Sequence, residues 1–214
     1  MEGRHKITDI RPQQKRRNRL AVFMDGEFAF GIHQDVLLVA GIAAGDELTD
    51  EQIAEIQELE RRHAAKEKAI RLLAYRARSR KEISDRLRQA GFQSAEIDWV
   101  LQELERLKLI DDGDFARLYA RTRMAARPVG ALALKLELKQ RGVSEPEITA
   151  ALQEAYSEKS EAELARELAA KQKKKQLRLD EEKAKSRTAD FLLRRGFGYD
   201  LVQEIIEEWD KLDT

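Results

Sequence analysis

The chain has 214 residues, of which 42% are hydrophobic and 37% charged, and its 40 Lys and Arg residues balance 40 Asp and Glu. It contains no cysteine, which excludes disulfides, thiolate metal sites and thiol nucleophiles and favours a reducing, cytoplasmic location. No apolar leader or bilayer-spanning run occurs, so the sequence predicts a protein outside the membrane.

Residues 1–48 are predicted to form a small antiparallel β element followed by a short helix. The dipeptide Asp25-Gly26 separates two β-prone runs and suits a two-residue type I′ hairpin turn. A further strand at residues 6–11 is predicted at the edge, and the basic stretch KRRNR at 15–19 connects it to the hairpin. Residues 35–40 are predicted to form the short helix.

A linker helix is predicted over residues 49–65. Thr49 and Gln52 have the spacing of a capping box, in which each side chain binds the backbone N–H of the other residue. No Gly or Pro interrupts the chain from there to Arg78, which is compatible with one continuous helix, and a break near residues 62–66 is the alternative.

An internal repeat follows. Nearly the same six letters occur three times: LRQAGF at 87–92, LKQRGV at 138–143 and LLRRGF at 192–197. Each glycine is predicted to end a helix by entering the left-handed region of backbone space. The apolar residues at −4, +6, +9 and +10 from the glycine are Leu87, Ile97, Val100 and Leu101, then Leu138, Ile148, Ala151 and Leu152, then Leu192, Val202, Ile205 and Ile206.

The predicted fold is all-α apart from the N-terminal β element. Three tandem three-helix repeats, at 66–110, 111–157 and 158–214, are expected to form an elongated, curved molecule. Ser79 and Glu82 are predicted to form the capping box that opens the second helix of the first repeat.

Charge follows the repeat. Each repeat has a basic stretch, which covers its first two helices, and then an acidic stretch at its third helix. The net charges are +6 for 66–90, −5 for 92–116, +6 for 117–141, −5 for 142–163, +5 for 164–188 and −4 for 189–214.

Two interpretations of this pattern are compatible with each other. In the first, the acidic third helix of one repeat lies beside the basic first helix of the next, and such pairs add little stability each. In the second, the basic helices present a row of cations to a polyanion or an acidic protein groove. The predicted basic row consists of Arg76, Arg78, Arg80, Lys81, Arg86, Arg88, Arg121, Arg123, Arg127, Lys135, Lys139 and Arg141.

No catalytic or cofactor-binding pattern is found. His5, His33 and His63 are far apart in the sequence and form no HxxxH or HExxH motif, and no phosphate-binding glycine loop or nucleophile elbow occurs. The DDGD stretch at 111–114 suits a helix start better than a metal loop. The sequence predicts a non-enzymatic protein without metal or cofactor. Tyr75, which has Arg76 beside it, is the one aromatic residue proposed for base stacking.

The residues that form these patterns resemble the RecX family of bacterial regulatory proteins. RARSRKEISDRLRQAGF at 76–92, VLQELERLKLIDDGDFARLYARTR at 100–123 and ALKLELKQRGVSEPEITAAL at 133–152 carry the resemblance. Residues 22–49 are similar to the extension found in longer members from Gram-positive bacteria. Arg127-Pro128-Val129-Gly130 and the lysine-rich third repeat depart from the family pattern.

The resemblance implies a partner and an activity. Its members bind the RecA recombinase polymerised on single-stranded DNA, dock in the filament groove and inhibit extension, ATP hydrolysis and strand exchange, which places them in recombination, DNA repair and SOS control. The chain is accordingly expected to be a monomer that binds the RecA filament, with single-stranded DNA as a secondary partner. Reversing Arg76, Arg78, Arg86 and Arg88 to Glu is expected to abolish inhibition.

Two other functions are compatible with the sequence. Three-helix units resemble helix-turn-helix modules, which would make the chain a plain nucleic-acid-binding protein, although an acidic third helix would be repelled by phosphates. A helical-repeat adaptor with another protein partner, docked through the N-terminal hairpin, is the second alternative.

Overall fold

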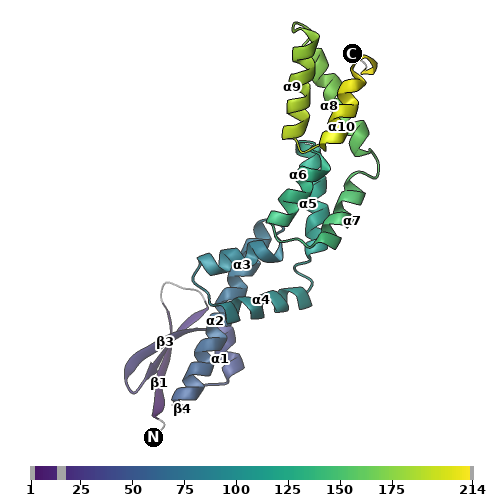
Figure 1. Ribbon diagram of the computed structural model, residues 1–214. Helices are drawn as coiled ribbons and strands as arrows, with labels where there is room; N and C mark the ends of the chain where they lie inside the picture. The colour runs from purple at the N-terminus through teal and green to yellow at the C-terminus, as the bar shows by residue number, and fades with distance from the viewer. Residues whose placement is uncertain (1–2, 14–17, 213–214) are drawn as a thin grey trace. The chain divides into compact units, whose positions relative to one another are not determined.

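The computed structural model describes residues 3–13 and 18–212 (Figure 1). Within these residues, four strands and ten α-helices succeed one another, the strands all lying before residue 50. The predicted all-α repeats with a small N-terminal sheet are confirmed. None of the helices described is long and apolar enough to cross a membrane.

The N-terminal sheet is antiparallel and four-stranded, in the order β3-β2-β1-β4. Its strands are β1 (Arg4–Pro12), β2 (Arg19–Met24), β3 (Glu27–His33) and β4 (Glu47–Thr49). The β2–β3 hairpin turns at Asp25 and Gly26, whose φ angles of 53° and 89° are those of the predicted type I′ turn.

The predicted edge position of the first strand is wrong. Strand β1 lies between β2 and β4, because three residues at 47–49 return to pair with its first half. So short a strand has no alternating pattern that the sequence could reveal. Residues 15–17 of the predicted basic connection lie outside the described residues.

Two helices cover one face of this sheet: α1 (Gln34–Ala40) and the first half of α2 (Asp50–Tyr75). The predicted capping box of Thr49 and Gln52 starts α2, and the α1 helix ends at Gly41, whose φ is 64°. The buried side chains of this core are Ile7, Val22, Met24, Ile32, Val36, Leu48 and Ile56.

The described residues form two compact units. The first contains residues up to 76 together with 83–107, and the second contains 77–82 together with 108–212. Helix α2 runs without a break, so the linker helix and the first helix of the first repeat are one helix.

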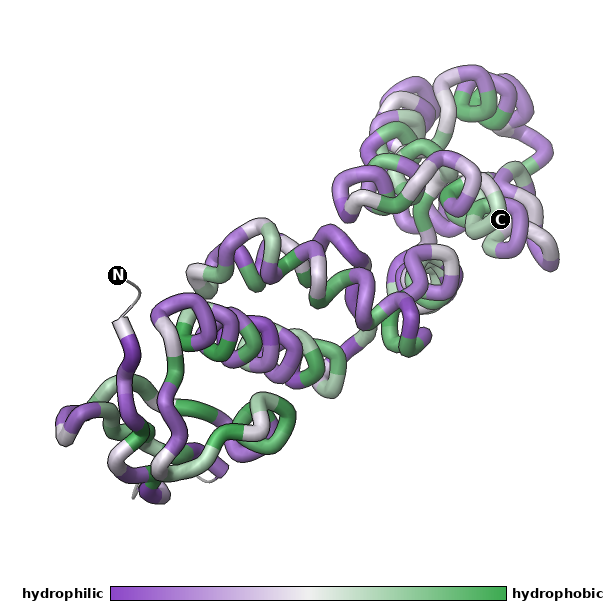
Figure 2. Tube along the Cα trace, turned by 90° about the horizontal axis from the view of Figure 1, so that it is seen from below, coloured by the Kyte–Doolittle hydropathy of each residue, from purple (hydrophilic) through white to green (hydrophobic). Residues whose placement is uncertain are grey.

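Each repeat consists of three helices. The first repeat has the second half of α2, then α3 (Arg80–Gln89) and α4 (Ser94–Arg106). The second repeat has α5 (Asp112–Ala126), α6 (Ala131–Gln140) and α7 (Glu145–Ala155). Apolar and polar residues are interspersed along these helices (Figure 2), as expected where each helix buries one apolar stripe of its surface.

The third repeat is built the same way and has a longer second helix. It consists of α8 (Glu161–Lys175), α9 (Glu181–Arg194) and α10 (Tyr199–Glu207), followed by a 3₁₀ turn at Trp209–Lys211. Phe197 and Trp209 are buried in its core.

The three repeat glycines have the predicted left-handed conformation, with φ of 90° at Gly91, 82° at Gly142 and 80° at Gly196. Their surroundings differ. A Cβ added to Gly196 would lie 2.3 Å from Cβ of Ala133, whereas one added to Gly91 would meet no heavy atom within 4 Å. The turns at Gly142 and Gly196 therefore have a second function, which is to pack closely against another helix.

That helix is the second helix of the preceding repeat, packed at its start. At the start of α6, the N–H of Gly130 donates to Arg195 O (2.9 Å) and the N–H of Leu132 donates to Gly196 O (3.2 Å). The N–H of Ala131 donates to Oε1 of Glu161, the first residue of α8 (2.8 Å).

The start of α3 has the same arrangement. Ser79 Oγ donates to Arg141 O (2.6 Å), and the N–H of Arg80 donates to Oδ1 of Asp112, the first residue of α5 (2.7 Å). Ser79 Oγ also accepts from the N–H of Glu82, as half of the predicted capping box requires. We call each of these two arrangements a repeat junction.

Replacing the repeat glycines with alanine should separate these two roles. Gly91→Ala should lower the free energy of unfolding by about 1 kcal/mol, the cost of a left-handed non-glycine residue. Gly196→Ala should cost several kcal/mol, because steric overlap with Ala133 adds to that cost.

The chain has two tryptophans, Trp99 in the first repeat and Trp209 in the third. Urea unfolding followed by Trp99 fluorescence in a Trp209→Phe background reports on Gly91→Ala. Trp209 fluorescence in a Trp99→Phe background reports on Gly196→Ala. Equal losses for the two glycines would contradict the close packing at Gly196.

His5 joins the β2–β3 hairpin turn to the start of α2. Its Nδ1 lies 3.0 Å from Asp25 Oδ2, and its Nε2 lies 3.2 Å from Asp50 Oδ1. Both nitrogens can donate at once only in the protonated ring, so the hydrogen bonds to Asp25 and then Asp50 raise the pKa of His5 above 6.5.

The stability that His5 contributes should therefore be fully present below pH 6.5 and be lost as the pH rises through its raised folded-state pKa. Asp25→Asn should bring the NMR titration midpoint of His5 down. Asp9→Asn, which removes a partner of Arg11 on the same strand, is the control and should leave that midpoint unchanged. A His5 midpoint that Asp25→Asn leaves in place would contradict the hydrogen bond.

Candidate partner-binding surface

The first-repeat part of the predicted basic row is mostly exposed. Arg76, Lys81, Arg86 and Arg88 are exposed, while Arg78 and Arg80 are half-buried. Arg88 pairs with Asp85 at 3.1 Å. Arg86 donates to Gln89 and has no recorded ion pair among the described residues, so its charge is available to a partner.

The second-repeat part of the row does not share one face. Positions 121 and 123 lie about 200° apart around α5, since successive helical residues turn by about 100°. Accordingly Arg121 lines a shallow groove between α5 and α7, beside Met124 and Glu154, whereas Arg123 faces α6. Arg121 and Arg127 are exposed, and neither has a recorded ion pair in the part of the chain that the structure describes.

Arg123 and Arg141 stabilise the second repeat internally. Glu137 on α6 accepts from Arg123 Nε (3.0 Å) and from the hydroxyl of Tyr119 (2.7 Å). The guanidinium of Arg141 lies 4.2 Å from the ring centroid of Tyr119 and donates to Glu137 O. Burial raises the pKa of Glu137, but the bonds from Arg123 and Tyr119 outweigh burial and leave that pKa lowered.

Three arginines converge on the loop between α5 and α6. Arg123 donates to Arg127 O, and Arg195 from the end of α9 donates to Pro128 O (2.8 Å). The side chain of Arg127 belongs to the same loop. We call Arg123, Arg127 and Arg195 the loop arginine cluster.

The loop arginine cluster has more positive charge than the carboxylate paired with it neutralises. Glu137 pairs with Arg123, but no carboxylate pairs with Arg127 or Arg195 among the described residues. Burial lowers the pKa of Arg195, and the charges of Arg127 and Arg123 lower it further. Its Nε is buried without a hydrogen-bond partner. An anionic group from a partner would relieve this repulsion.

Arg195 is absent from the predicted basic row. A signal for it exists in the sequence: the residue before the repeat glycine is arginine at 141 and 195 but alanine at 90. Only the structure shows that Arg195 meets the loop of the second repeat, because that contact joins residues 67 positions apart.

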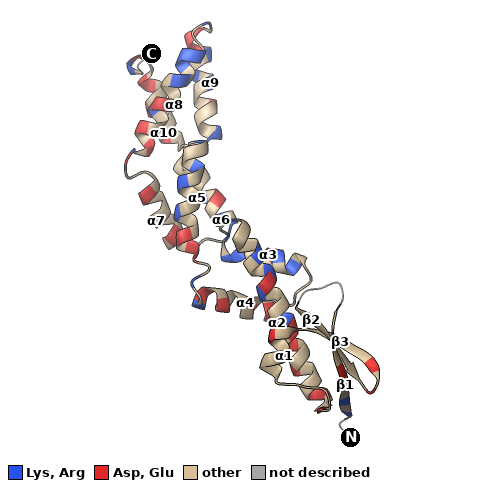
Figure 3. Ribbon diagram, turned by 180° about the vertical axis from the view of Figure 1, so that it is seen from behind, with Lys and Arg blue, Asp and Glu red and all other residues tan. Residues whose placement is uncertain are grey.

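Acidic residues are frequent on α4, α7 and α10 (Figure 3). Their ion pairs with other helices include contacts to the first helix of the same repeat, for α4 and α10, and to its second helix, for Glu145 on α7, which binds Lys135 and Lys139. Glu103 on α4 binds Lys66 on α2 (3.1 Å), and Arg166 on α8 binds Glu204 on α10 and Glu208, which directly follows α10. For α4, the predicted pairing with the next repeat is instead found within its own repeat, because α2 and α4 pack side by side.

Glu103 shows how tightly these acids are held. Hydrogen bonds from Arg106 and then Lys66 lower its pKa to about 2. The acidic helices are thus partly neutralised by their own repeat, and the unpaired cations named above are the charges available to a partner.

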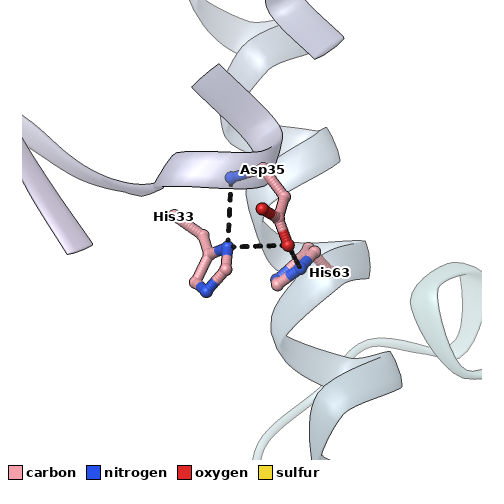
Figure 4. A group of neighbouring side chains, drawn as sticks. All are labelled: His33, Asp35 and His63. Carbon is pink, nitrogen blue, oxygen red and sulfur yellow. Dashed lines mark hydrogen bonds and ion pairs between the residues drawn. The ribbon is translucent and has the colours of Figure 1, made fainter. Parts of the chain in front are cut away.

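Two of the three histidines come together with an aspartate (Figure 4). Nδ1 of His33 accepts from the N–H of Asp35 (3.2 Å) and caps α1, and the His33 and His63 rings stack with their centroids 4.2 Å apart. Stacked rings direct their in-plane lone pairs side by side rather than towards one point. The arrangement therefore serves as a helix cap and a contact between α1 and α2, which sequence spacing gave no reason to expect.

Tyr75 ends α2 with its side chain 85% exposed, the most exposed of the large hydrophobic side chains described. Such a ring is free to stack on a base, and its role there stays a prediction.

Four family models match successive parts of the chain. They are described as the regulatory protein RecX N-terminal domain, at residues 5–49, and the first, second and third three-helix domains of RecX, at 65–104, 111–152 and 159–206.

Relatives and solved structures match over most of the chain. Regulatory protein RecX of Bacillus licheniformis is 32% identical over 95% of this chain and 77% of its own length, and that of Leuconostoc mesenteroides is 31% identical over 94% and 75%. A crystal structure of regulatory protein RecX is 28% identical and covers 95% of this chain and 100% of its own, with a TM-score of 0.76. The RecX structure from Lactobacillus salivarius, also 28% identical, covers 71% and 97% with a TM-score of 0.62.

Replacing Glu137 with glutamine should destabilise the second repeat by about 1–3 kcal/mol at pH 7, because partly buried donors lose a charged acceptor. Since the pKa of Glu137 is lowered, its contribution is present above pH 4.5 and is lost as the pH falls through the folded-state pKa.

Urea unfolding followed by circular dichroism at pH 7 and pH 3 measures both effects. Glu158→Gln, at an exposed acid that directly follows the second repeat, is the control and should leave the free energy of unfolding unchanged. An equally silent Glu137→Gln would show that the Glu137 network contributes nothing.

Proposed function

The chain belongs to the RecX family of regulatory proteins, and from this premise we propose that it binds the RecA recombinase filament on single-stranded DNA and inhibits its extension, ATP hydrolysis and strand exchange. It does so as a monomer in the cytoplasm, without catalysis of its own. Through this inhibition it acts in recombination, DNA repair and SOS control.

The loop arginine cluster is the observation that best supports this proposal. A filament groove offers acidic protein side chains with phosphates close by, and both are anionic. Arg127 and Arg195 have no carboxylate of their own among the described residues, so an anion from the filament would replace repulsion by attraction. A partly desolvated ion pair also discriminates between partners better than an exposed one.

The rest of the predicted basic row acts by long-range attraction. Arg86 and Arg121, exposed and without recorded ion pairs in the described residues, add positive potential in each compact unit. Such charges mainly raise the association rate, and salt screens them. A chain held in the groove restrains the subunit movements that extension and ATP turnover require.

One observation favours a DNA contact in addition. The exposed ring of Tyr75 suits stacking on an unpaired base. A helix-turn-helix mode is disfavoured, because the third helices α4, α7 and α10 are acidic.

The direct test is ATP hydrolysis by a bacterial RecA on single-stranded DNA, titrated with the chain at substoichiometric ratios. The hydrolysis rate should fall. The triple reversal Arg86→Glu, Arg121→Glu and Arg127→Glu should weaken inhibition at least tenfold, because it removes attraction without breaking a recorded ion pair.

The matched control is Lys174→Glu, Lys175→Glu and Arg178→Glu, which changes the net charge equally at exposed positions outside the predicted row. It should inhibit nearly as well as the parent chain. No inhibition by the folded parent chain would refute the proposed function, and equal loss in both triple variants would refute the specific role of the row.

A further inference from the structure

Helix α6 has a leucine at every second position: 132, 134, 136 and 138. On a helix this spacing divides the leucines between two faces. Leu134 and Leu138 are fully buried in the core of the second repeat, whereas Leu132 and Leu136 are 60% and 57% exposed. The helix is apolar on its inner face and on its outer face.

The outer leucines have cationic neighbours. Leu132 and Leu136 are one turn apart, so their side chains are adjacent, and Lys135 and Lys139 fall within the same third of the helical circumference. Both lysines share a single acid, Glu145, at 2.9 and 3.4 Å. The outer face of α6 is therefore an apolar pair beside net positive charge, and the loop arginine cluster lies where the helix begins.

The fold of a repeat does not need leucine at these positions. Counting from the repeat glycines, Leu132 and Leu136 correspond to Lys81 and Asp85 on α3 and to Ser186 and Asp190 on α9. The sister helices form the same unit with charged or small polar residues there. The outer pair of α6 is thus an internal exception, and exposing it to water gives no benefit to the free chain.

We infer that the outer face of α6 is a docking surface for a protein, namely an apolar patch with acidic residues at its rim on the recombinase subunits of the filament. This inference rests on the proposed function and names the surface that contacts the recombinase itself. Leu132 and Leu136 fill the apolar patch, and Lys135 and Lys139 meet the acidic rim.

Two features favour a protein occupant over nucleic acid. Leucine side chains gain nothing from phosphates, whereas an apolar centre with a charged rim is the usual anatomy of a protein interface. Two aromatic rings near α6 are also covered by guanidinium groups, Tyr119 by Arg141 and Phe191 by Arg195, which makes them poor platforms for base stacking.

The test replaces Leu132 with Ser and Leu136 with Asp, the residues that α9 carries at the corresponding positions. Binding of fluorescently labelled chain to a preformed RecA filament on single-stranded DNA is measured by anisotropy, with a non-hydrolysable ATP analogue. The double variant should bind at least tenfold more weakly, with unchanged circular dichroism and melting temperature. Leu118→Asp with Leu177→Ser, at two other exposed leucines of the same unit, is the control and should bind like the parent chain.

Four outcomes would overturn the inference. Unchanged filament binding by the double variant overturns it and leaves the proposed function intact, whereas absence of binding by the parent chain overturns both. An equal loss of binding to naked oligo(dT) would identify nucleic acid as the occupant. A parent chain that sediments as a dimer, with a monomeric double variant, would identify a second copy of the chain.

Discussion

The packing of one repeat against the next in the second compact unit depends on the hydrogen bonds at the start of the second helix of a repeat. The first N–H groups of a helix lack partners within that helix, and burying them unpaired is costly. At α6 these groups bind the carbonyls of Arg195 and Gly196 and the carboxylate of Glu161. At α3 the same positions bind Asp112 and, through Ser79, the carbonyl of Arg141. Each repeat junction thus pairs donors from one repeat with acceptors from the next, and glycine is required because a side chain would separate them.

The turn at Gly91 and the start of α9 differ from the two repeat junctions. Gly91, which has no repeat before it, meets nothing within 4 Å, and alanine precedes it where the other turns have arginine. Helix α9 starts further from its glycine than α3 or α6 does. Its own Asp180 caps it by accepting from the N–H of Lys183. Helix α9 is therefore capped by a residue of its own repeat, whereas α3 and α6 rely on acceptors from a neighbouring repeat.

Local rules were sufficient for much of the fold. The sequence directly predicts features that depend on a few adjacent residues. These are the left-handed glycines, the type I′ turn at Asp25-Gly26 and the capping box of Thr49 and Gln52. Strand β4 was missed, because three residues carry no periodicity. The pairing of α4 with its own repeat was missed because charge counts do not say which helices touch. The contact of Arg195 with the loop of the second repeat and the stacking of His33 on His63 were not predicted for the same reason, because distant segments come together only in three dimensions. In the predicted basic row, Arg123 and Arg141 are internal partners of Glu137, and partner binding by the row stays a prediction.

The same constraint explains why the candidate surface lies where it does. The junction at the start of α6 brings Arg195 to the loop that holds Arg127, and the core contacts of Leu134 and Leu138 leave Leu132 and Leu136 facing outwards. Amide hydrogen exchange, resolved by residue, tests this account most directly. We predict slow exchange at Gly130, Ala131 and Leu132, and fast exchange at Glu181 and Glu182, first-turn amides with no recorded partner among the described residues. Fast exchange at all five amides would show that the junction does not hold the helix start and would contradict the account.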